Sequence, residues 1–175
     1  MFQIANIPIA ACSTSIVNIT LSGNYAYLGC SSYGMQIVDI SNPASPVPQG
    51  IIDPGYAMQI VVSGNYAYVA AYTSGFRIID ISDPVNPVLL GNGTVTAASL
   101  GGNARGVFLV GNYAYVAADT GGLQIVNVTD FVNNNAGGSN GPVRVGGYNT
   151  PGIAYRVKVA GTVAYVADDS GGLQM

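Results

Sequence analysis

A five-residue phrase that recurs along the chain constrains the fold more than any other feature. Gly-Asn-Tyr-Ala-Tyr stands at 23–27, 64–68 and 111–115, and a degenerate copy, Gly-Thr-Val-Ala-Tyr, stands at 161–165. Eleven residues after the first glycine of each copy, a second glycine opens another shared phrase, such as Met-Gln-Ile-Val-Asp at 35–39. Repeats with a period of about 20–50 residues indicate a chain built from stacked copies of one structural unit.

Each unit contains four short strand-like runs separated by Gly, Asn, Ser or Pro. In the first unit these runs are 16–21, 25–30, 35–40 and a weaker one at 47–49, and we name them strands A, B, C and D. The A–B connection is a Gly-Asn turn, which tolerates the positive φ of short hairpins. Proline follows strand C in the first two units, and since proline cannot donate to a ladder, strand D is predicted at an outer edge.

The spacing of the units predicts the architecture. The first glycines of successive phrases are 41, 47 and 50 residues apart, and the extra residues fall around 92–102 and 131–141, which we interpret as inserted loops. Four antiparallel strands in a unit of this length are typical of a β-propeller blade, and a β-solenoid repeat is usually shorter. The sequence therefore predicts an all-β propeller of about four four-stranded antiparallel blades in a single domain, 1–175. The predicted units are 6–50, 51–91, 92–146 and 147–175.

The two ends bear on how the propeller closes. Residues 2–5 align with the D strands and residues 173–175 fall within a C strand. The last blade is therefore predicted to be incomplete, or closed by the N-terminal strand, which would remove an unpaired edge. Two alternatives stay open. The chain is a piece of a larger propeller, which an end within a repeated phrase favours, or open strand edges pair between subunits and build an oligomer or filament.

Composition narrows the function. Only 7% of the residues are charged, against about 25% in soluble domains. A net charge of −3 offers no basic patch, so nucleic acid is not a predicted partner. No apolar stretch is long enough to span a membrane. Low charge with abundant Asn, Thr and Tyr suits an extracellular or cell-surface protein whose export signal is not in this chain. The absence of His excludes Ser-His-Asp catalysis.

Three phrases make the chain similar to a known family. Gly-Asn-Tyr-Ala-Tyr-Val-Ala at 64–70, Ile-Ser-Asp-Pro-Val-Asn-Pro-Val at 81–88 and Gly-Leu-Gln-Ile-Val-Asn at 122–127 resemble the repeat of the LVIVD-repeat family. The resemblance covers almost the whole chain. It implies a propeller of bacterial or archaeal type, commonly exported or surface-attached, with no general catalytic motif. The chain departs from the pattern at 129–131, where the proline pair is lost, and at the last blade.

Candidate ligand residues lie on or beside the A strands, which line the central channel of a propeller. They are Gln59, Arg105, Arg156 and Lys158. A cationic funnel at the channel mouth could bind an anion, a carboxylate or an acidic sugar. The alternative is that these side chains pair with Asp and water and fill the channel.

Three aspartates form the second candidate group. Asp119, Asp168 and Asp169 lie on predicted B–C loops of the same face. Oxygen-rich loops of this kind can ligate Ca²⁺, although Asp in a turn ordinarily caps its own backbone. No other cofactor is predicted, and zinc is excluded because the chain offers no His and only two distant Cys. Asp119 with Asp168 or Asp169 is also the one pairing that could support glycoside hydrolysis.

Two covalent features are predicted as alternatives. Cys12 and Cys30 could form a disulfide within the first repeat, or they could be small buried apolar residues. Asn92 begins an Asn-Gly-Thr sequon in a predicted loop and is a glycosylation candidate in a glycosylating host.

These observations favour a non-enzymatic extracellular or cell-surface scaffold for protein or glycan binding, or for assembly. Two alternatives stay open: a glycan-active enzyme that uses the loop-face aspartates, and a purely structural subunit of a filament or surface layer.

Overall fold

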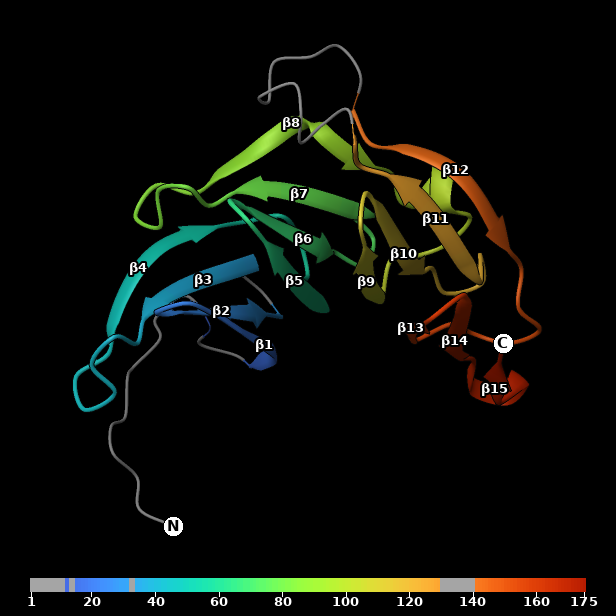
Figure 1. Cartoon of the computed structure of the whole chain (residues 1–175), viewed down its shortest axis with the longest axis horizontal. Coiled ribbons are helices and arrows are strands. Elements are labelled where there is room, and N and C mark those ends of the chain that lie inside the picture. Colours follow the sequence, from blue (N-terminus) through green and yellow to red (C-terminus); the bar gives the residue numbers. More distant parts are fainter. Residues whose placement is uncertain (1–11, 13–14, 32–33, 130–140) are drawn as a thin grey trace.

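The computed structural model describes residues 12, 15–31, 34–129 and 141–175. These residues form four small antiparallel sheets that follow one another around a common axis as the blades of a β-propeller (Figure 1). The predicted fold class is confirmed. The strands of the first two blades are β1 (Ile16–Ser22), β2 (Tyr25–Cys30), β3 (Gly34–Asp39), β4 (Val47–Ile52), β5 (Gln59–Ser63), β6 (Tyr66–Ala70), β7 (Phe76–Asp80) and β8 (Val88–Val95). Those of the last two are β9 (Gly106–Val110), β10 (Tyr113–Ala117), β11 (Leu123–Asn127), β12 (Val143–Tyr148), β13 (Arg156–Ala160), β14 (Val163–Ala167) and β15 (Leu173–Gln174).

The described blades have the predicted strand order, with A innermost and, in the first three blades, D outermost. The first three sheets have four strands, and in the described residues the fourth has three, β13-β14-β15. The last blade is therefore incomplete in this part of the chain. The predicted closing strand, residues 2–5, lies outside the described residues.

The second repeated glycine recurs because the backbone leaves room for no other residue. Gly75 has φ +82°, and a Cβ added there would lie 2.2 Å from the carbonyl oxygen of Val95 at the end of β8. Gly122 repeats this geometry in the third blade, with φ +70° and the carbonyl oxygen of Tyr148 at 2.4 Å from the added Cβ. Only glycine fits a positive φ combined with such close approach of another strand.

Apolar side chains from successive blades meet and form the core. We call the face that a blade turns to the next blade its forward face, and the opposite face its backward face. Between the first two blades, Tyr27, Met35 and Ile37 of the forward face pack against Ile60 and Val69 of the backward face. Burial of each large apolar side chain contributes about 1.5–3 kcal/mol to folding, so these joints hold the fold together.

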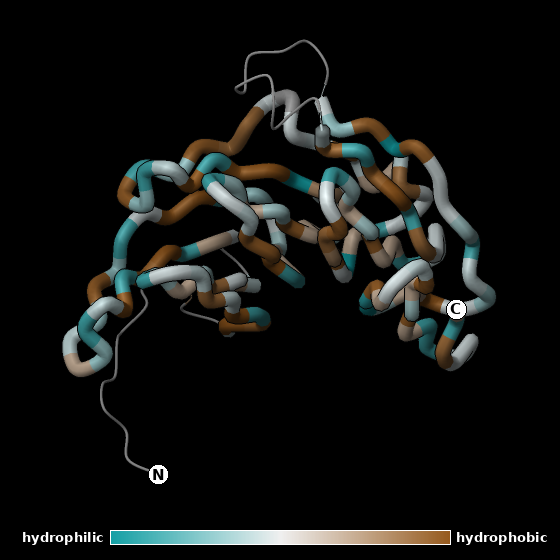
Figure 2. Tube along the Cα trace, in the orientation of Figure 1, coloured by the Kyte–Doolittle hydropathy of each residue, from teal (hydrophilic) through white to brown (hydrophobic). Residues whose placement is uncertain are grey.

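The joint between the second and third blades repeats this arrangement. Tyr68, Phe76 and Ile78 pack against Val107 and Val116, which occupy the same repeat positions as the residues of the first joint. Figure 2 shows hydrophobic stretches recurring along the strands of every blade. In the second and third blades both faces are apolar because both are covered by neighbours, which is why strands B and C there do not alternate cleanly in polarity.

The blades form an arc in which consecutive inner strands pack together: β1 on β5, β5 on β9, and β9 on β13. No comparable packing joins β1 to β13 among the described residues. Figure 1 shows these two strands near opposite ends of the arc.

The inserted residues around 92–102 are not simply a loop, and this prediction was wrong. Residues 90–93 lie within β8, opposite the single residue Ile78, so the strand absorbs an insertion as a bulge. The chain then forms the short helix α1 (Ala97–Leu100), whose N-cap Thr96 accepts a hydrogen bond from the backbone of Ser99. Asn92 consequently lies on a strand and not in a loop. Most of the second insertion, 131–140, lies outside the described residues.

The two cysteines are joined in the structure. Cys12 and Cys30 form a disulfide with their Cα atoms 5.1 Å apart. Both are buried beside Ala26, Leu28 and Val38 on the backward face of the first blade. The disulfide therefore attaches Cys12 to the outer part of that face, on β2 and β3.

Candidate functional site

The candidate residues gather where the connections between the second, third and fourth blades meet. Arg105 lies just before β9, and its Nη2 atom forms an ion pair with Oδ2 of Asp119 at 3.1 Å. Asn103 donates a second hydrogen bond to the same oxygen, also at 3.1 Å. The side chains of Arg105 and Asp119 are only 15% and 11% exposed, so the pair is largely shielded from water.

Two aromatic rings flank the Arg105 guanidinium. Its central carbon lies 5.0 Å from the ring centroid of Tyr72 and 4.6 Å from that of Tyr155. A cation over an aromatic face is attracted by the negative centre of the ring. Nε of Arg105 is buried without a hydrogen-bond partner among the described residues. Arg105 is therefore held by the second, third and fourth blades and is not presented to solvent.

The backbone at this position also joins the blades. Asp119 and Ala154 exchange hydrogen bonds of 3.3 and 3.0 Å, and Tyr72 and Ala104 make the equivalent pair one blade earlier, at 2.9 and 3.1 Å. Tyr72 and Asp119 have φ values of +48° and +54°, as does Asp169 at +39°, and all three occupy one repeat position. The B–C loops of the second and third blades thus use the left-handed conformation at this position to reach the next blade.

Arg156 reaches back from β13 towards the previous blade. Its Nη1 atom donates to the carbonyl oxygens of Arg105 at 2.7 Å and Tyr155 at 2.9 Å. Although much of the side chain is exposed, partial burial lowers the pKa of the guanidinium, and the charge of Arg105 lowers it further. The positive charges of Arg105 and Arg156 therefore lie close together, and the carboxylate of Asp119 neutralises one of them.

In the first two blades, the side chains at the channel-facing position, Asn18 and Gln59, bind the backbone of the next blade. The side-chain oxygen of Gln59 accepts from the backbone of Val107 at 3.1 Å, and that of Asn18 accepts from Ile60 at 3.1 Å. Each side-chain amide thus accepts a hydrogen bond from a backbone N–H group on the inner strand of the following blade. Gln59 is part of the joint between blades and not of a solvent-facing funnel.

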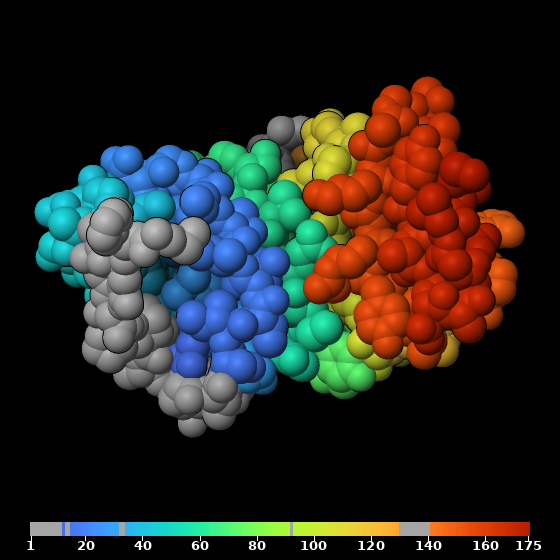
Figure 3. All heavy atoms as spheres, turned by 90° about the horizontal axis from the view of Figure 1, so that it is seen from below, coloured from blue at the N-terminus to red at the C-terminus, as the bar shows by residue number. Residues whose placement is uncertain are grey.

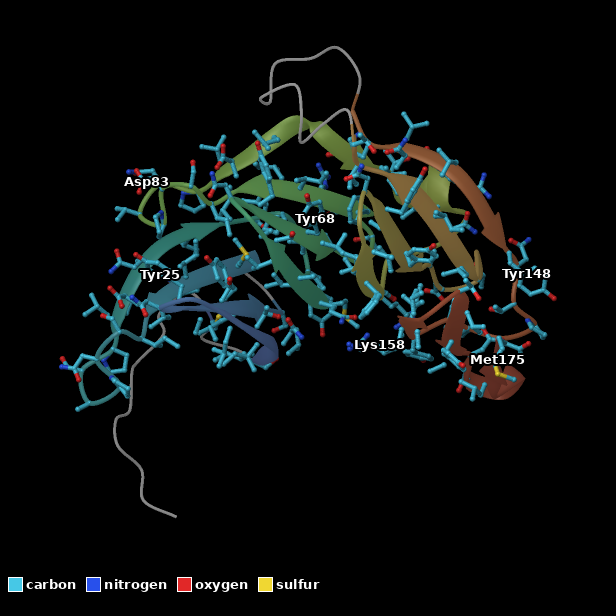
Figure 4. The ribbon with its side chains drawn as sticks, viewed as in Figure 1. Tyr25, Tyr68, Asp83, Tyr148, Lys158 and Met175 are labelled. Atoms are coloured by element: carbon cyan, nitrogen blue, oxygen red, sulfur yellow. A yellow bond between two sulfur atoms is a disulfide. The ribbon has the colours of Figure 1, made fainter. Side chains whose placement is uncertain are left out.

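Lys158 is the candidate cation that remains most open. It is exposed on β13, with its Nζ atom 4.9 Å from the centroid of the Phe108 ring. Figure 4 shows the side chain pointing from the fourth blade towards the concave side of the arc. Lys158 and Arg156 lie two residues apart on one strand and so share a face.

The three aspartates do not converge on one site. Asp168 is 1% exposed, and its carboxylate accepts from the hydroxyl of Thr150 and, at 2.8 Å, from the backbone of Gly152. Asp169 is exposed and begins a short 3₁₀ turn, Asp169–Gly171. Asp119 has the separate partners described above, so Asp119 and Asp168 each bind the connection that precedes the inner strand of a blade.

Sequence reasoning missed a pocket between the third and fourth blades. Leu123 and Tyr148 line one side, and Val163, Val166 and Met175 line the other, around a largely apolar space of about 340 Å³. No repeated phrase signals this pocket, because it depends on how the third and fourth blades pack together. Tyr72, Asn103, Tyr155 and Thr150 were also missed, because they become partners only when blades meet.

Two further features concern the described residues. No group of three or more His, Cys, Asp or Glu side chains gathers there in a way that could hold a metal ion. None of the helices in that part of the chain has both the length and the apolarity to cross a membrane.

Comparison with known families identifies the repeat. The sequence profile of the LVIVD repeat matches residues 15–53, 54–95, 101–139 and 151–175. The chain belongs to the LVIVD-repeat family. The four LVIVD repeats correspond to the four blades, and the resemblance noted in the sequence is confirmed. No curated protein matches the chain.

Solved structures share the fold of this LVIVD-repeat protein at low sequence identity. The computationally designed Ika4 protein matches with a TM-score of 0.66 and 9% identity over 91% of this chain and 89% of that one. The designed Ika8 protein matches with a TM-score of 0.64 and 10% identity over 91% and 44%. BamB from Moraxella catarrhalis matches with a TM-score of 0.56 and 14% identity over 89% and 42%. The LVIVD-repeat chain thus spans less than half of the last two.

Proposed function

We propose that this LVIVD-repeat propeller is a non-enzymatic extracellular or cell-surface scaffold that binds a protein or glycan partner. One observation carries the proposal: Asp119, which every candidate catalytic pair requires, and Asp168 are both used to hold loops together. Glycoside hydrolysis needs two available carboxyl groups, one that protonates the leaving group and one that acts as a base or as a nucleophile. Asp119 is committed to Arg105 and Asn103, and Asp168 to Thr150 and Gly152.

The remaining charge at the channel favours an acidic partner. Arg156 and Lys158 are exposed and share one face of β13, whereas Arg105 is neutralised by Asp119. Exposed cations on a concave surface attract carboxylates of an acidic glycan or of a protein surface. The disulfide between Cys12 and Cys30 supports the extracellular part of the proposal, since disulfides persist in oxidising compartments.

Parallel assays of binding and hydrolysis test this function. The purified chain is incubated with polygalacturonate, an acidic polysaccharide, and with dextran, a neutral one. We expect no new reducing ends from either polymer, and binding to polygalacturonate that the double variant Arg156→Ala, Lys158→Ala weakens by more than about tenfold. Arg144→Ala, which removes a cation from the outer strand β12, is the matched control. New reducing ends that disappear in Asp168→Asn would overturn the non-enzymatic assignment.

A further inference from the structure

Apolar residues that the inner blades bury are exposed on the first blade. Ile19 and Leu21 lie two residues apart on β1 and are 60% and 63% exposed. Ile60 of the second blade and Val157 of the fourth occupy the repeat position of Ile19, and each is only 1% exposed. The outer part of this backward face is buried beside Cys12, but its inner part, on β1, is an apolar stripe open to solvent.

The forward face of the fourth blade shows the complementary feature. Leu173 on β15 is 64% exposed, whereas Met35 and Phe76, which occupy its repeat position in the first two blades, are fully buried. The first and fourth blades therefore present the two halves of one more joint between blades.

A blade face that is exposed to solvent is expected to carry polar side chains. Repeat proteins require end repeats whose outer face is polar, because an uncovered repeat face is an aggregation risk. Here the uncovered positions Ile19, Leu21 and Leu173 are apolar. Exposed apolar patches of this kind mark interaction surfaces.

Both faces point to the same side of the molecule. Figure 3, seen from below, shows the first blade in blue and the fourth in red, side by side with a strip of the second and third blades between them. Figure 1 shows the same two blades at the ends of the arc. One further body placed on this side can therefore cover both faces at once.

We propose that this body is a second copy of the chain. The forward face of the fourth blade of each copy packs on the backward face of the first blade of the other, and a two-fold axis closes both copies into one ring. The new interface continues the three joints already present within one chain, since the residues stand at the same repeat positions. A head-to-tail interface of this kind occurs twice, and closure prevents growth into a fibre. The inference names the partner for assembly and rests on the scaffold role proposed above.

A hydrogen bond that joins two blades within the chain can also form between the two copies, from β13 of one to β1 of the other. In the first joint, the hydroxyl of Thr20 donates to the carbonyl oxygen of Ile60 at 2.6 Å. Lys158 occupies the repeat position of Thr20, and Ile19 occupies that of Ile60. One of the three N–H groups of the Lys158 ammonium can therefore donate to the Ile19 carbonyl of the second copy, and the other two remain for an acidic partner. Arg156 already donates to carbonyl oxygens of its own chain, so it needs no acceptor from the second copy.

The experiment measures the mass of the 175-residue chain by light scattering on a size-exclusion column, over a range of concentrations. We expect twice the 17.8 kDa of one chain. Ile19→Asp and Leu173→Asp should each weaken the association by more than about tenfold, because each buries an unpaired carboxylate in the joint. Val145→Asp, at a site 53% exposed on the outer strand β12, is the matched control and should leave the mass unchanged.

Mixing the two variants tests the head-to-tail arrangement. The intact fourth blade of the Ile19→Asp variant can pair with the intact first blade of the Leu173→Asp variant, so the mixture should regain the double mass. Circular dichroism establishes that each variant is folded. A wild-type monomer at every concentration, an open-ended polymer, or a mixture without recovery would overturn the two-copy ring. Binding of polygalacturonate is measured in the same samples. If the two-copy ring is overturned but the chain still binds polygalacturonate, the proposed scaffold role stands independently of the ring.

Discussion

The guanidinium of Arg105 and the carboxylate of Asp119 meet at 3.1 Å at the point where three blades converge. The rings of Tyr72 and Tyr155 cover the cation, and Asn103 shares the carboxylate oxygen. A pair that resembles a ligand site in the sequence therefore works as a clamp between blades.

Asp119→Asn should destabilise the fold, because it leaves the Arg105 cation shielded from water without a counter-charge. The loss of such a charged hydrogen bond costs about 1–3 kcal/mol. The unfolding free energy from urea titration measures it. Asp169→Asn, at the equivalent repeat position but exposed, is the control and should change stability by less than about 0.5 kcal/mol. Equal losses in both variants would contradict the clamp.

Gly75→Ala should cost more than Gly64→Ala, although both residues have positive φ. At Gly75 the new Cβ would lie 2.2 Å from the Val95 carbonyl oxygen, whereas at Gly64 no atom lies within 4 Å. We expect about 1–2 kcal/mol at Gly64 from backbone strain alone. Gly75→Ala adds a clash with the backbone of β8. Equal urea midpoints for the two variants would contradict this prediction, because they would mean that β8 moves away from the new Cβ at no cost in stability.

Stability should fall in acid through the turn aspartates after strand C. The backbone hydrogen bond from Ser41 is the largest cause that lowers the pKa of Asp39 below its ordinary 3.8. For Asp83, a side-chain hydrogen bond from Asn86 comes first, followed by one from the backbone of Val85, and together they lower its pKa as well.

A carboxylate with a lowered folded-state pKa stabilises the protein above its unfolded pKa, and this contribution is lost as the pH falls through the folded pKa. We therefore expect the urea midpoint to fall from about pH 4 downwards. The double variant Asp39→Asn, Asp83→Asn should show a smaller fall over the same range. An unchanged pH profile would mean that other carboxylates dominate the acid response.

Reduction of the disulfide should loosen the first blade. A cross-link between residues 18 apart is worth about 3 kcal/mol in the chain-entropy account. We expect dithiothreitol to lower the thermal midpoint of the wild-type chain but not that of Cys12→Ser. Cys12→Ser without reductant should match the reduced wild type. A wild-type midpoint that ignores reductant would contradict a stabilising cross-link.

The repeat alone predicted the architecture. Gly34, Gly75, Gly122 and Gly172 mark the start of each strand C, and the Gly-Asn turns mark the first three A–B hairpins, because these local conformations admit few other residues. Four copies at a spacing typical of blades then led to a propeller. Asn92 was misplaced because a bulge in β8 absorbs the insertion, and the local sequence carries no signal for that choice.

The site residues were found by type, but their roles were decided only by tertiary structure. The sequence identified Arg105 and Asp119 as candidates without indicating that they pair, because their contact depends on how the second, third and fourth blades pack. Tyr155 and Thr150 acquire partners for the same reason. Local conformation is encoded residue by residue, so the sequence by itself determined the blades. Whether a side chain faces solvent, a ligand or the next blade depends on the angle between blades, and that angle arises only when their apolar faces meet.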